Sequence, residues 1–422
     1  MKEVAIGIFV VTYILLLALP RHRSYIAFIA ALLYVVLGIL PLANVVQAID
    51  WNVLLMIAGT MGIVALFIES KMPALLAGLV LSRTPNIRWA IVALFLFSGI
   101  ISAFIDNVAT VLIVVPVALT IANRLKTSPV PMVLAISISS NLQGAATLVG
   151  DTTSILLGGH ANLDFLDFFF YLGKPGMFWI VQAGAIASML VLLVILRREK
   201  DPINITSTTI VKDYVPSLLL VAMIVLLILA SFIPNKPSIT NGLIATGLFL
   251  IGLIHEYLKE GKAEVVWKAI REIDYQTLLL LTGIFILIGG LVEKGVIQDV
   301  AKLFVSISGD SVFLAYTLIV WASVIFSAFI DNIPYVAAML PVASSIATSL
   351  NAPPEVLLFG LLVGATLGGN LSPIGASANI AALGILRKEG HVVSTLEFMK
   401  LGVPLTLAAV TSGYLLVWWL FG

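Results

Sequence analysis

The chain contains no cysteine, and only 11% of its residues are charged. The lack of cysteine excludes disulfides, thiolate metal sites and thiol nucleophiles. Phosphate-binding glycine loops, catalytic triads and zinc motifs are also missing from the sequence, and the net charge of +1 gives no sign of nucleic-acid binding. We therefore predict a protein that is not an enzyme and that has no catalytic residues, no bound metal and no nucleic-acid partner.

The residues that are present are mostly apolar. Hydrophobic residues make up 60% of the chain and its mean hydropathy is +1.13, whereas soluble domains are roughly 25% charged. Apolar runs of about 17–25 residues are long enough to cross a bilayer. Such runs lie at about 4–19, 25–40, 52–68, 177–196, 214–233, 241–256, 275–291 and 401–420. Two longer apolar regions, 89–158 and 315–386, are interrupted by Asp, Asn, Gly and Pro. The chain is predicted to be an integral membrane protein.

The sequence repeats itself at an offset of 225 positions. "SAFIDN" occurs at 102–107 and again at 327–332, and "TLVGDTTSI" (147–155) aligns with "SPIGASANI" (372–380) in the same register. The offset predicts a first repeat at 1–196, a cytoplasmic linker at 197–213 and a second repeat at 214–422. Each repeat would hold five crossings, one of them a broken helix, plus a re-entrant hairpin. An odd number of crossings inverts the second repeat relative to the first.

We therefore predict an all-α membrane protein with about 10 transmembrane helices plus two re-entrant hairpins, in two inverted-topology repeats with two broken helices. Basic residues orient this topology: with both termini outside, 18 of the 23 lysines and arginines fall on the inner side and five on the outer side. This distribution agrees with the positive-inside rule. We expect a multi-pass protein of the plasma (inner) membrane.

The Asp-Asn pairs of the repeated motif are the first candidate site residues. Asp106-Asn107 and Asp331-Asn332 would lie at the two hairpin tips, where a carboxylate at bilayer depth costs roughly 2.5–3.5 kcal/mol and should face a protein interior or an aqueous cavity. Carboxylates and exposed carbonyls suit a small cation, whereas helix N-termini suit an anion. The alternative is that each pair occupies an ordinary loop between two complete spans.

The two interrupted segments, 146–154 and 370–379, are the second candidate site. Gly150 and Gly375 are equivalent in the repeat, and hydroxyl or amide ligands surround them, as expected of a binding site near the bilayer midplane. These ligands are Thr147, Thr152, Thr153, Ser154, Ser372, Ser377 and Asn379. The alternative is close helix packing through small residues.

Asp151 breaks the symmetry of the two segments because its equivalent in the second repeat is Ala376. A single buried carboxylate could bind and release one proton or cation in each transport cycle. We therefore predict that Asp151 is the proton-coupling residue.

The motifs "SAFIDN", "GAATLVGD", "SAFIDNIP" and "GGNLSPIGASAN" resemble the ion transporter superfamily, in the branch of ArsB and NhaD, and most closely permeases of the P-protein type. The resemblance covers nearly the whole chain. It implies a scaffold domain and a transport domain, elevator-like alternating access and commonly a homodimer. It also places Asn107, Asn332 and the two broken-helix segments around the site. "SSN" (139–141) continues as Leu142-Gln143, which departs from the Ser-Asn-Thr signature of the dicarboxylate branch, and Ile105 departs from the ArsB pattern.

The predicted function is secondary-active transport of a small inorganic ion or (hydr)oxide, with arsenite or antimonite efflux coupled to protons as the leading prediction. The alternatives are a sodium/proton antiporter of the NhaD type, another anion permease and a passive ion channel. The expected partners are the solute, a coupling ion (H+ or Na+), the lipid bilayer and a second copy of the chain, with no other cofactor.

Overall fold

The computed structural model describes residues 1–199, 201–202 and 209–422. Ten of its α-helices precede the predicted linker: α1 (Lys2–Ala18), α2 (Arg23–Val36), α3 (Leu42–Ala48), α4 (Trp51–Glu69), α5 (Met72–Leu81), α6 (Ile87–Ser102), α7 (Asn107–Leu125), α8 (Val130–Gly144), α9 (Thr152–Ala161) and α10 (Met177–Ile195). Residues 200 and 203–208 of the predicted linker lie outside the described residues.

Ten further α-helices follow: α11 (Val215–Ala230), α12 (Thr240–Glu260), α13 (Ala263–Arg271), α14 (Tyr275–Glu293), α15 (Val296–Ser308), α16 (Val312–Ser327), α17 (Asn332–Ser349), α18 (Pro354–Leu362), α19 (Ser377–Lys388) and α20 (Thr395–Phe421). The 3-10 turns are η1 (Pro20–His22), η2 (Phe165–Phe168) and η4 (Gly369–Leu371), and η3 (Val363–Leu367) is a π-helical turn. Strands β1 (Phe170–Tyr171) and β2 (Lys174–Pro175) form a small antiparallel pair.

Within the described residues, seven helices are long and apolar enough to cross a membrane, or nine if each of two sharply bent helix pairs counts as one span. The bent pairs are α1 with α2, at 115°, and α15 with α16, at 113°. This architecture confirms the prediction of an all-α membrane protein. The repeat boundaries at 196 and 214 stay a prediction.

Several helices begin at a polar residue whose side chain accepts a hydrogen bond from the first turn. Such a cap satisfies amides that have no partner within the helix. The capping residues include Asp50, Asn86, Asp106, Asp274, Ser311, Asp331 and Ser394. Two of them are the aspartates of the repeated motif, so "SAFIDN" is a turn followed by a helix start in both copies.

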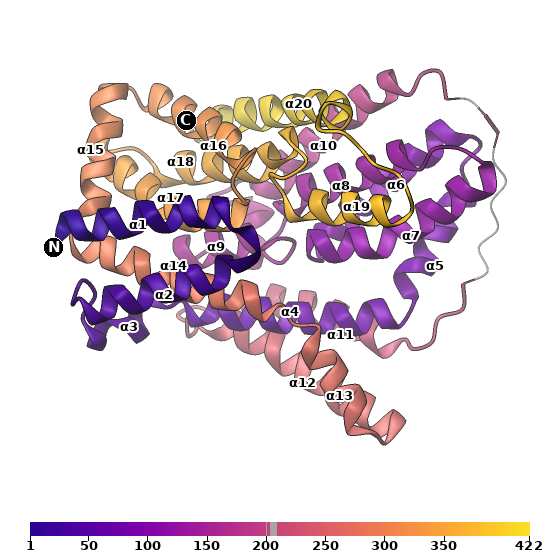
Figure 1. Ribbon diagram of the computed structural model, residues 1–422, viewed down its shortest axis with the longest axis horizontal. Coiled ribbons are helices and arrows are strands. Elements are labelled where there is room, and N and C mark those ends of the chain that lie inside the picture. The colour runs from indigo at the N-terminus through magenta and orange to yellow at the C-terminus, as the bar shows by residue number, and fades with distance from the viewer. Residues whose placement is uncertain (200, 203–208) are drawn as a thin grey trace.

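The helices form two groups. In the scaffold group, which comprises α1, α2, α4, α11, α12 and α14, helix α2 packs on α14 and α4 packs on α12. In the hairpin group, which comprises α6 to α10 and α16 to α20, the hairpins α6–α7 and α16–α17 pack on the broken helices α8–α9 and α18–α19. Figure 1 shows α6, α7 and α8 on the right and α16, α17 and α18 on the left, so the two hairpins approach the centre from opposite ends.

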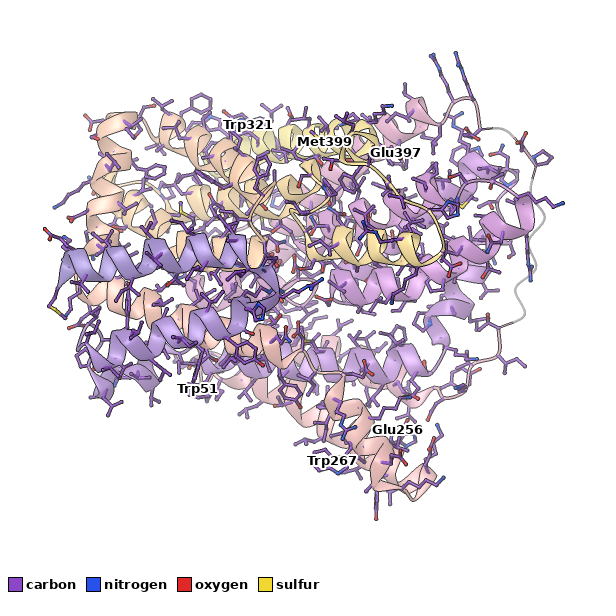
Figure 2. The ribbon with its side chains drawn as sticks, viewed as in Figure 1. Trp51, Glu256, Trp267, Trp321, Glu397 and Met399 are labelled. Atoms are coloured by element: carbon purple, nitrogen blue, oxygen red, sulfur yellow. The ribbon has the colours of Figure 1, made fainter. Side chains whose placement is uncertain are left out.

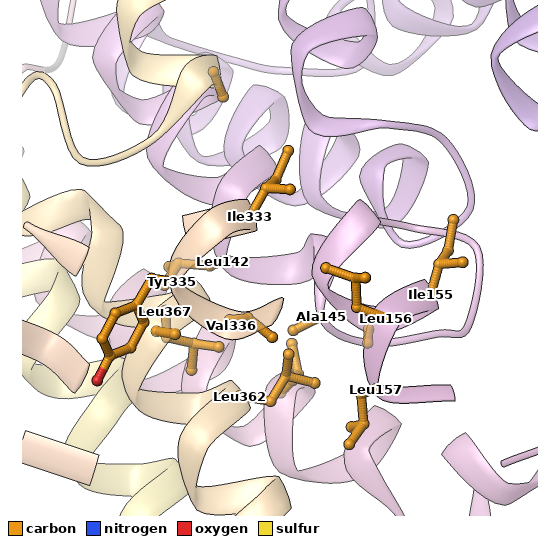
Figure 3. Close-up of a cluster of buried hydrophobic side chains, with 14 of the residues drawn as sticks. Leu142, Ala145, Ile155, Leu156, Leu157, Ile333, Tyr335, Val336, Leu362 and Leu367 are labelled. Carbon is orange, nitrogen blue, oxygen red and sulfur yellow. The ribbon is translucent and has the colours of Figure 1, made fainter. Parts of the chain in front are cut away.

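The second part of each broken helix crosses to the other repeat. Helix α9 packs on α17, and α19 packs on α7 and α8. Figure 3 shows the apolar core that this exchange creates, in which Leu156 of α9 and Val336 of α17 are buried near Leu362 of α18. The four segments that carry the candidate site therefore meet in the middle of the molecule.

The outer surface of the bundle is apolar, as a lipid-facing surface requires. Trp51 and Trp267 are 46% and 60% exposed. Figure 2 shows both at the edge of the bundle, with Trp321 on the opposite edge. Trp51 is the first residue of α4, and an aromatic side chain at the end of a spanning helix is typical of a membrane interface.

Candidate functional site

Four helices begin at one central cavity of about 610 Å³. Their first residues, Asn107 of α7, Thr152 of α9, Asn332 of α17 and Ser377 of α19, all line its wall. A helix N-terminus carries roughly +0.5 charge from its aligned peptide dipoles. The sequence achieves this convergence because each hairpin tip and each helix break ends in a turn that starts a new helix.

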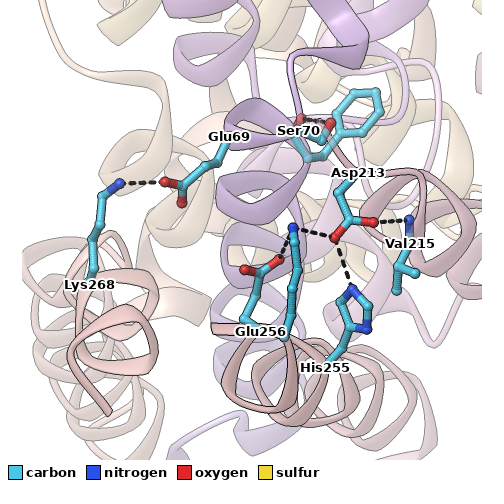
Figure 4. Close-up of polar contacts among 9 residues, drawn as sticks. Glu69, Ser70, Asp213, Val215, His255, Glu256 and Lys268 are labelled. Atoms are coloured by element: carbon cyan, nitrogen blue, oxygen red, sulfur yellow. Dashed lines mark hydrogen bonds and ion pairs between the residues drawn. The ribbon is translucent and has the colours of Figure 1, made fainter. Parts of the chain in front are cut away.

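The remaining wall of the cavity comes from the scaffold group and from α13. Met61 and Glu69 of α4, Lys268 and Glu272 at the end of α13, and Asp274 before α14 line it. Figure 4 shows Glu69 accepting a hydrogen bond from Lys268, at 2.5 Å, where α13 crosses the end of α4. The Nζ of Lys268 is thus already paired with an acid.

Asp106 and Asp331 cap their helices in different ways. The Oδ2 atom of Asp106 accepts hydrogen bonds from the backbone N–H groups of Val108 and Ala109, at 2.9 and 3.1 Å. Asp331 accepts one backbone bond, from Ile333 at 3.3 Å, and its Oδ2 forms an ion pair with Arg23 of α2. The two copies of the motif therefore carry different charge environments.

Asp151 is the N-cap residue of α9, but its side chain does not cap the helix. It is 3% exposed and lines the cavity. Its Oδ2 atom accepts a hydrogen bond from Thr153 Oγ1 at 3.2 Å and lies 3.5 Å from Asn107 Nδ2. Within the described chain this carboxylate has no ion pair, and its side-chain hydrogen-bond partners are a hydroxyl and an amide.

A short polar chain joins the two repeats beneath the cavity. Asn107 Nδ2 donates to Asn141 Oδ1 at 3.1 Å, and Asn141 Nδ2 donates to the carbonyl of Thr366 at 2.8 Å. Thr366 lies in the π-helical turn η3, and its hydroxyl is 3.0 Å from that of Thr153. Asn141 and Thr366 are equivalent in the repeat, so matching positions of the two repeats meet at this contact. π-Turns inside helices are frequent at functional sites.

The two helix breaks are built alike. Thr147 donates to the carbonyl of Ala103, and Ser372 donates to the carbonyl of Ala328, which is the same pair of contacts 225 positions later. Gly150 packs against backbone: a Cβ there would lie 2.6 Å from the carbonyl oxygen of Gly144 and 2.7 Å from two further carbonyl oxygens. The hydroxyls of Thr147 and Ser372 therefore support the two helix breaks and do not line the cavity.

The structure divides the predicted site residues into two sets. The set that lines the cavity is Asp106, Asn107, Asp151, Thr152, Asn332 and Ser377. The set that surrounds it without lining it is Asp331, Thr147, Gly150, Thr153, Ser154, Ser372, Gly375 and Asn379. Ser154, for example, donates to the carbonyl of Gly144 at 3.3 Å and is fully buried.

Four residues of this region were missed by sequence reasoning. Arg23 could not be identified because an arginine commonly follows an apolar run. Asn141 and Thr366 lie in segments whose composition is typical of helices that pack against other helices. Asp274 could have been found, since "IDYQTLLL" (273–280) matches "IDWNVLLM" (49–56) at an offset of 224 and both aspartates precede an apolar run.

A second hollow, of about 970 Å³, lies at the other end of α4. Asp50, Trp51 and Asn52 at the start of α4 line it, whereas Ile68 and Glu69 at the end of α4 line the central cavity. The ion pair between Asp164 and Lys236 connects the loop after α9 with the loop before α12 at this hollow. The molecule thus has hollows at both ends of one spanning helix.

An ionic cluster fixes the end of the linker to the scaffold group. Burial raises the pKa of the Asp213 carboxyl, but hydrogen bonds from Lys259, the backbone of Val215 and His255 outweigh burial and hold this pKa well below its usual range. Asp213, His255 and Glu256 place their ligand atoms within 4.8 Å of one another. Lys259 Nζ lies 2.7 Å from Asp213 Oδ2, so a cation already occupies the cluster. Figure 4 shows Asp213 beside His255 and Glu256.

Comparison with protein families gives a match over most of the chain. Residues 13–364 match the family model CitMHS, described as citrate transporter. The uncharacterized transporter Mb2703 of Mycobacterium bovis is 29% identical, with 99% of this chain and 98% of that protein covered. The human P protein is 26% identical over 98% of this chain, which spans 59% of that protein's length. These relatives confirm the predicted resemblance to the P-protein type.

Solved structures share the fold at low sequence identity. The YdaH transporter of Alcanivorax borkumensis superposes with a TM-score of 0.60 at 13% identity, covering 89% of this chain and 86% of that one. MtrF of Neisseria gonorrhoeae, described as one of a class of antimetabolite efflux pumps, gives a TM-score of 0.56 at 16% identity, with coverages of 90% and 84%.

Proposed function

This chain belongs to the CitMHS citrate transporter family, and from this premise we propose that it exports a small uncharged inorganic (hydr)oxide of the arsenite or antimonite type in exchange for protons. Secondary transport is the property of the family. The solute, the coupling ion, outward transport, elevator-like movement and a homodimeric assembly are our proposals for this chain.

The observation that carries the proposal is the environment of Asp151. Its carboxylate lies on the cavity wall, has no basic partner in the described chain, and contacts Thr153 and Asn107. A carboxylate in such a place is costly to keep charged. Proton binding from one side and release to the other would relieve this cost and drive transport.

The charge balance of the cavity disfavours an anionic solute. Four helix N-termini contribute roughly +0.5 each and Arg23 contributes a full positive charge, whereas Asp106, Asp151 and Asp331 contribute three negative charges. Asp274 is offset in part by the N-terminus of α14, which it caps. Glu69 and Lys268 cancel, and Glu272 adds one more negative charge, so the sum is about −0.5 when Asp151 is protonated and about −1.5 when it is ionised. An anion is therefore disfavoured, whereas a neutral hydroxide can be held by hydroxyl and amide groups while Asp151 is protonated.

Free citrate fits this balance poorly, although the family description names it. Three carboxylates would enter a cavity whose basic side chains, Arg23 and Lys268, are already paired with Asp331 and Glu69. A citrate that entered with a bound cation would escape this repulsion. Sodium/proton antiport at the same carboxylates is the second candidate, because Asp151 and the two hairpin aspartates could ligate a cation directly.

Proteoliposomes that contain a pH-sensitive dye test the proposal. We expect an antimonite or arsenite gradient to drive proton flux through the wild-type protein. Asp151→Asn, which keeps the size and hydrogen-bonding shape of the side chain, should abolish the flux. Asp310→Asn, which alters an exposed aspartate remote from the cavity, serves as the matched control.

The outcomes separate the candidates. If Asp151→Asn abolishes sodium-dependent proton flux while arsenite tolerance of expressing cells is unchanged, the oxide proposal fails and antiport replaces it. Conductance that needs no gradient partner would favour a passive channel. A thermal-shift panel with sodium, arsenite, antimonite, silicate, chloride and citrate adds an independent readout, since a ligand that binds only the folded state stabilises it.

A further inference from the structure

Arg23 is the one basic side chain that joins the scaffold group to a hairpin tip at the central cavity within the described chain. It is the first residue of α2, directly after the bend between α1 and α2, and pairs with Asp331, the N-cap of α17. The side chains are only 25% and 15% exposed. A second contact runs beside the pair, since the Tyr13 hydroxyl donates to the carbonyl of Pro334 at 2.7 Å.

The ion pair has no counterpart in the other repeat. Applying the two offsets of the internal repeat, Arg23 falls on Gly247 or Leu248 of α12, neither of which is basic. Asp106, the equivalent of Asp331, has no ion pair in the described chain and depends on two backbone N–H groups. The sequence therefore places a fixed positive charge beside only one of the two hairpin tips.

Asp331 needs that charge more than Asp106 would. It accepts one backbone hydrogen bond, at 3.3 Å, and its Oδ2 atom is shared by Arg23 and by Ser377 Oγ, at 3.2 Å. If the hairpin moved away from α2, this partly buried carboxylate would keep only the amide of Ile333 and the hydroxyl of Ser377 as donors. An uncompensated buried charge is strongly unfavourable, so a mobile cation or a proton would have to take the place of the guanidinium.

We propose that Arg23 is a built-in competitor for the coupling cation at Asp331. The guanidinium occupies the carboxylate while the central cavity has its present shape, and a sodium ion or proton replaces it when the hairpin leaves α2. The exchange rests on the proposed function in so far as the protein is a cation-coupled transporter. It does not require Asp151, so it can be tested separately from that residue.

The test measures cation binding to the purified full-length protein by thermal unfolding. Sodium is titrated against choline at constant ionic strength, and pH is titrated in a second series. An arginine that occupies the carboxylate nine-tenths of the time weakens the apparent affinity for a competing cation about tenfold. We therefore expect Arg23→Gln to gain about tenfold in apparent affinity for sodium or protons.

Three variants control the measurement. Arg21→Gln, in the same turn but exposed, should behave as wild type. The double variant Arg23→Gln/Asp331→Asn should lose the gained affinity. Arg23→Lys, whose ammonium is more strongly hydrated and lacks the planar fork, should lie between wild type and Arg23→Gln, and it decides the question if Arg23→Gln does not fold.

The pH series compares variants that share every other titratable group around the pair, so a difference between them isolates the exchange. Those groups are Tyr13, Glu69, Asp106, Asp151, Lys268, Glu272 and Asp274. The proposal is overturned if Arg23→Gln, or Arg23→Lys in its place, binds sodium and protons as wild type does, or if the gained affinity persists without Asp331. The same titration in an Asp151→Asn background distinguishes this failure from failure of the proton-coupling proposal.

Discussion

Replacing Gly150 by alanine should disrupt the first broken helix. The new Cβ would lie 2.6 Å from the carbonyl oxygen of Gly144 and 2.7 Å from those of Ser102 and Ala103, which is closer than carbon and oxygen normally approach. Overpacking in a buried site costs typically 1–3 kcal/mol. Because all three obstacles are backbone atoms that cannot rotate away, we expect a loss of about 3 kcal/mol in the free energy of unfolding.

Gly384→Ala is the matched control for this substitution. Gly384 lies inside α19, and no atom lies within 4 Å of the position of its Cβ. Alanine at an open helix position is favoured over glycine by up to about 1 kcal/mol. The two substitutions add the same methyl group to the hairpin group, yet their effects should have opposite signs and differ by roughly 3–4 kcal/mol.

Unfolding of the purified protein by a denaturing detergent, followed by circular dichroism, measures this difference. The transport assay gives a second readout, because the shift of Gly150 would displace the adjacent Asp151 from Asn107 and Thr153. Gly375→Ala should reproduce the loss of stability, since its Cβ would lie 2.5 Å from the carbonyl oxygen of Gly369. If Gly150→Ala unfolds within about 0.5 kcal/mol of wild type, the usual range for unstrained surface changes, the close-approach argument is refuted.

Three further predictions concern the helix break, the linker and the cavity. Thr147→Val should destabilise the protein by about 1–3 kcal/mol in the same unfolding assay, because the buried carbonyl of Ala103 loses its hydroxyl donor; equal stability would contradict this. Because the pKa of Asp213 is held low in the folded state, its ion pairs stabilise the protein above the unfolded pKa and lose this effect as the pH falls through the folded one. Asp213→Asn should therefore cost roughly 0.2–1 kcal/mol at pH 7 and flatten the acid limb of the pH-stability curve, and an unchanged acid limb would count against it. Since the chain has no cysteine, Ala381→Cys on the cavity wall should be the sole thiol and react with a hydrophilic maleimide, whereas the neighbouring, fully buried Ala382→Cys should not; similar labelling rates would argue against an open cavity.

Much of the fold could be predicted because membrane insertion is a strong constraint on sequence. Apolar runs of spanning length, the register of the repeat and the polar interruptions are all visible without coordinates, and the structure has its hairpins and helix breaks where "SAFIDN" and "TLVGD" predict them. The sequence places Asp106, Asn107 and Asp151 near the site because a polar side chain within a membrane-spanning segment is costly and usually has a function there.

What sequence reasoning could not do was assign each polar residue its partner. Thr147 and Ser372 have the same composition as binding residues, yet their hydroxyls satisfy backbone carbonyls at the breaks. A hydroxyl that closes a turn and one that binds a solute look alike in a sequence, because the choice depends on which atom lies within 3 Å.

The sequence by itself therefore determined the membrane class, the twofold repeat and the asymmetry at Asp151, since these follow from composition and from residues compared position by position. Only the tertiary structure decided that four helix N-termini share one cavity, that η3 offers the Thr366 carbonyl to Asn141, and that Arg23 reaches Asp331 across 308 positions of chain. Contacts between distant segments arise from how helices pack against each other, and a local pattern of residues carries no record of that packing.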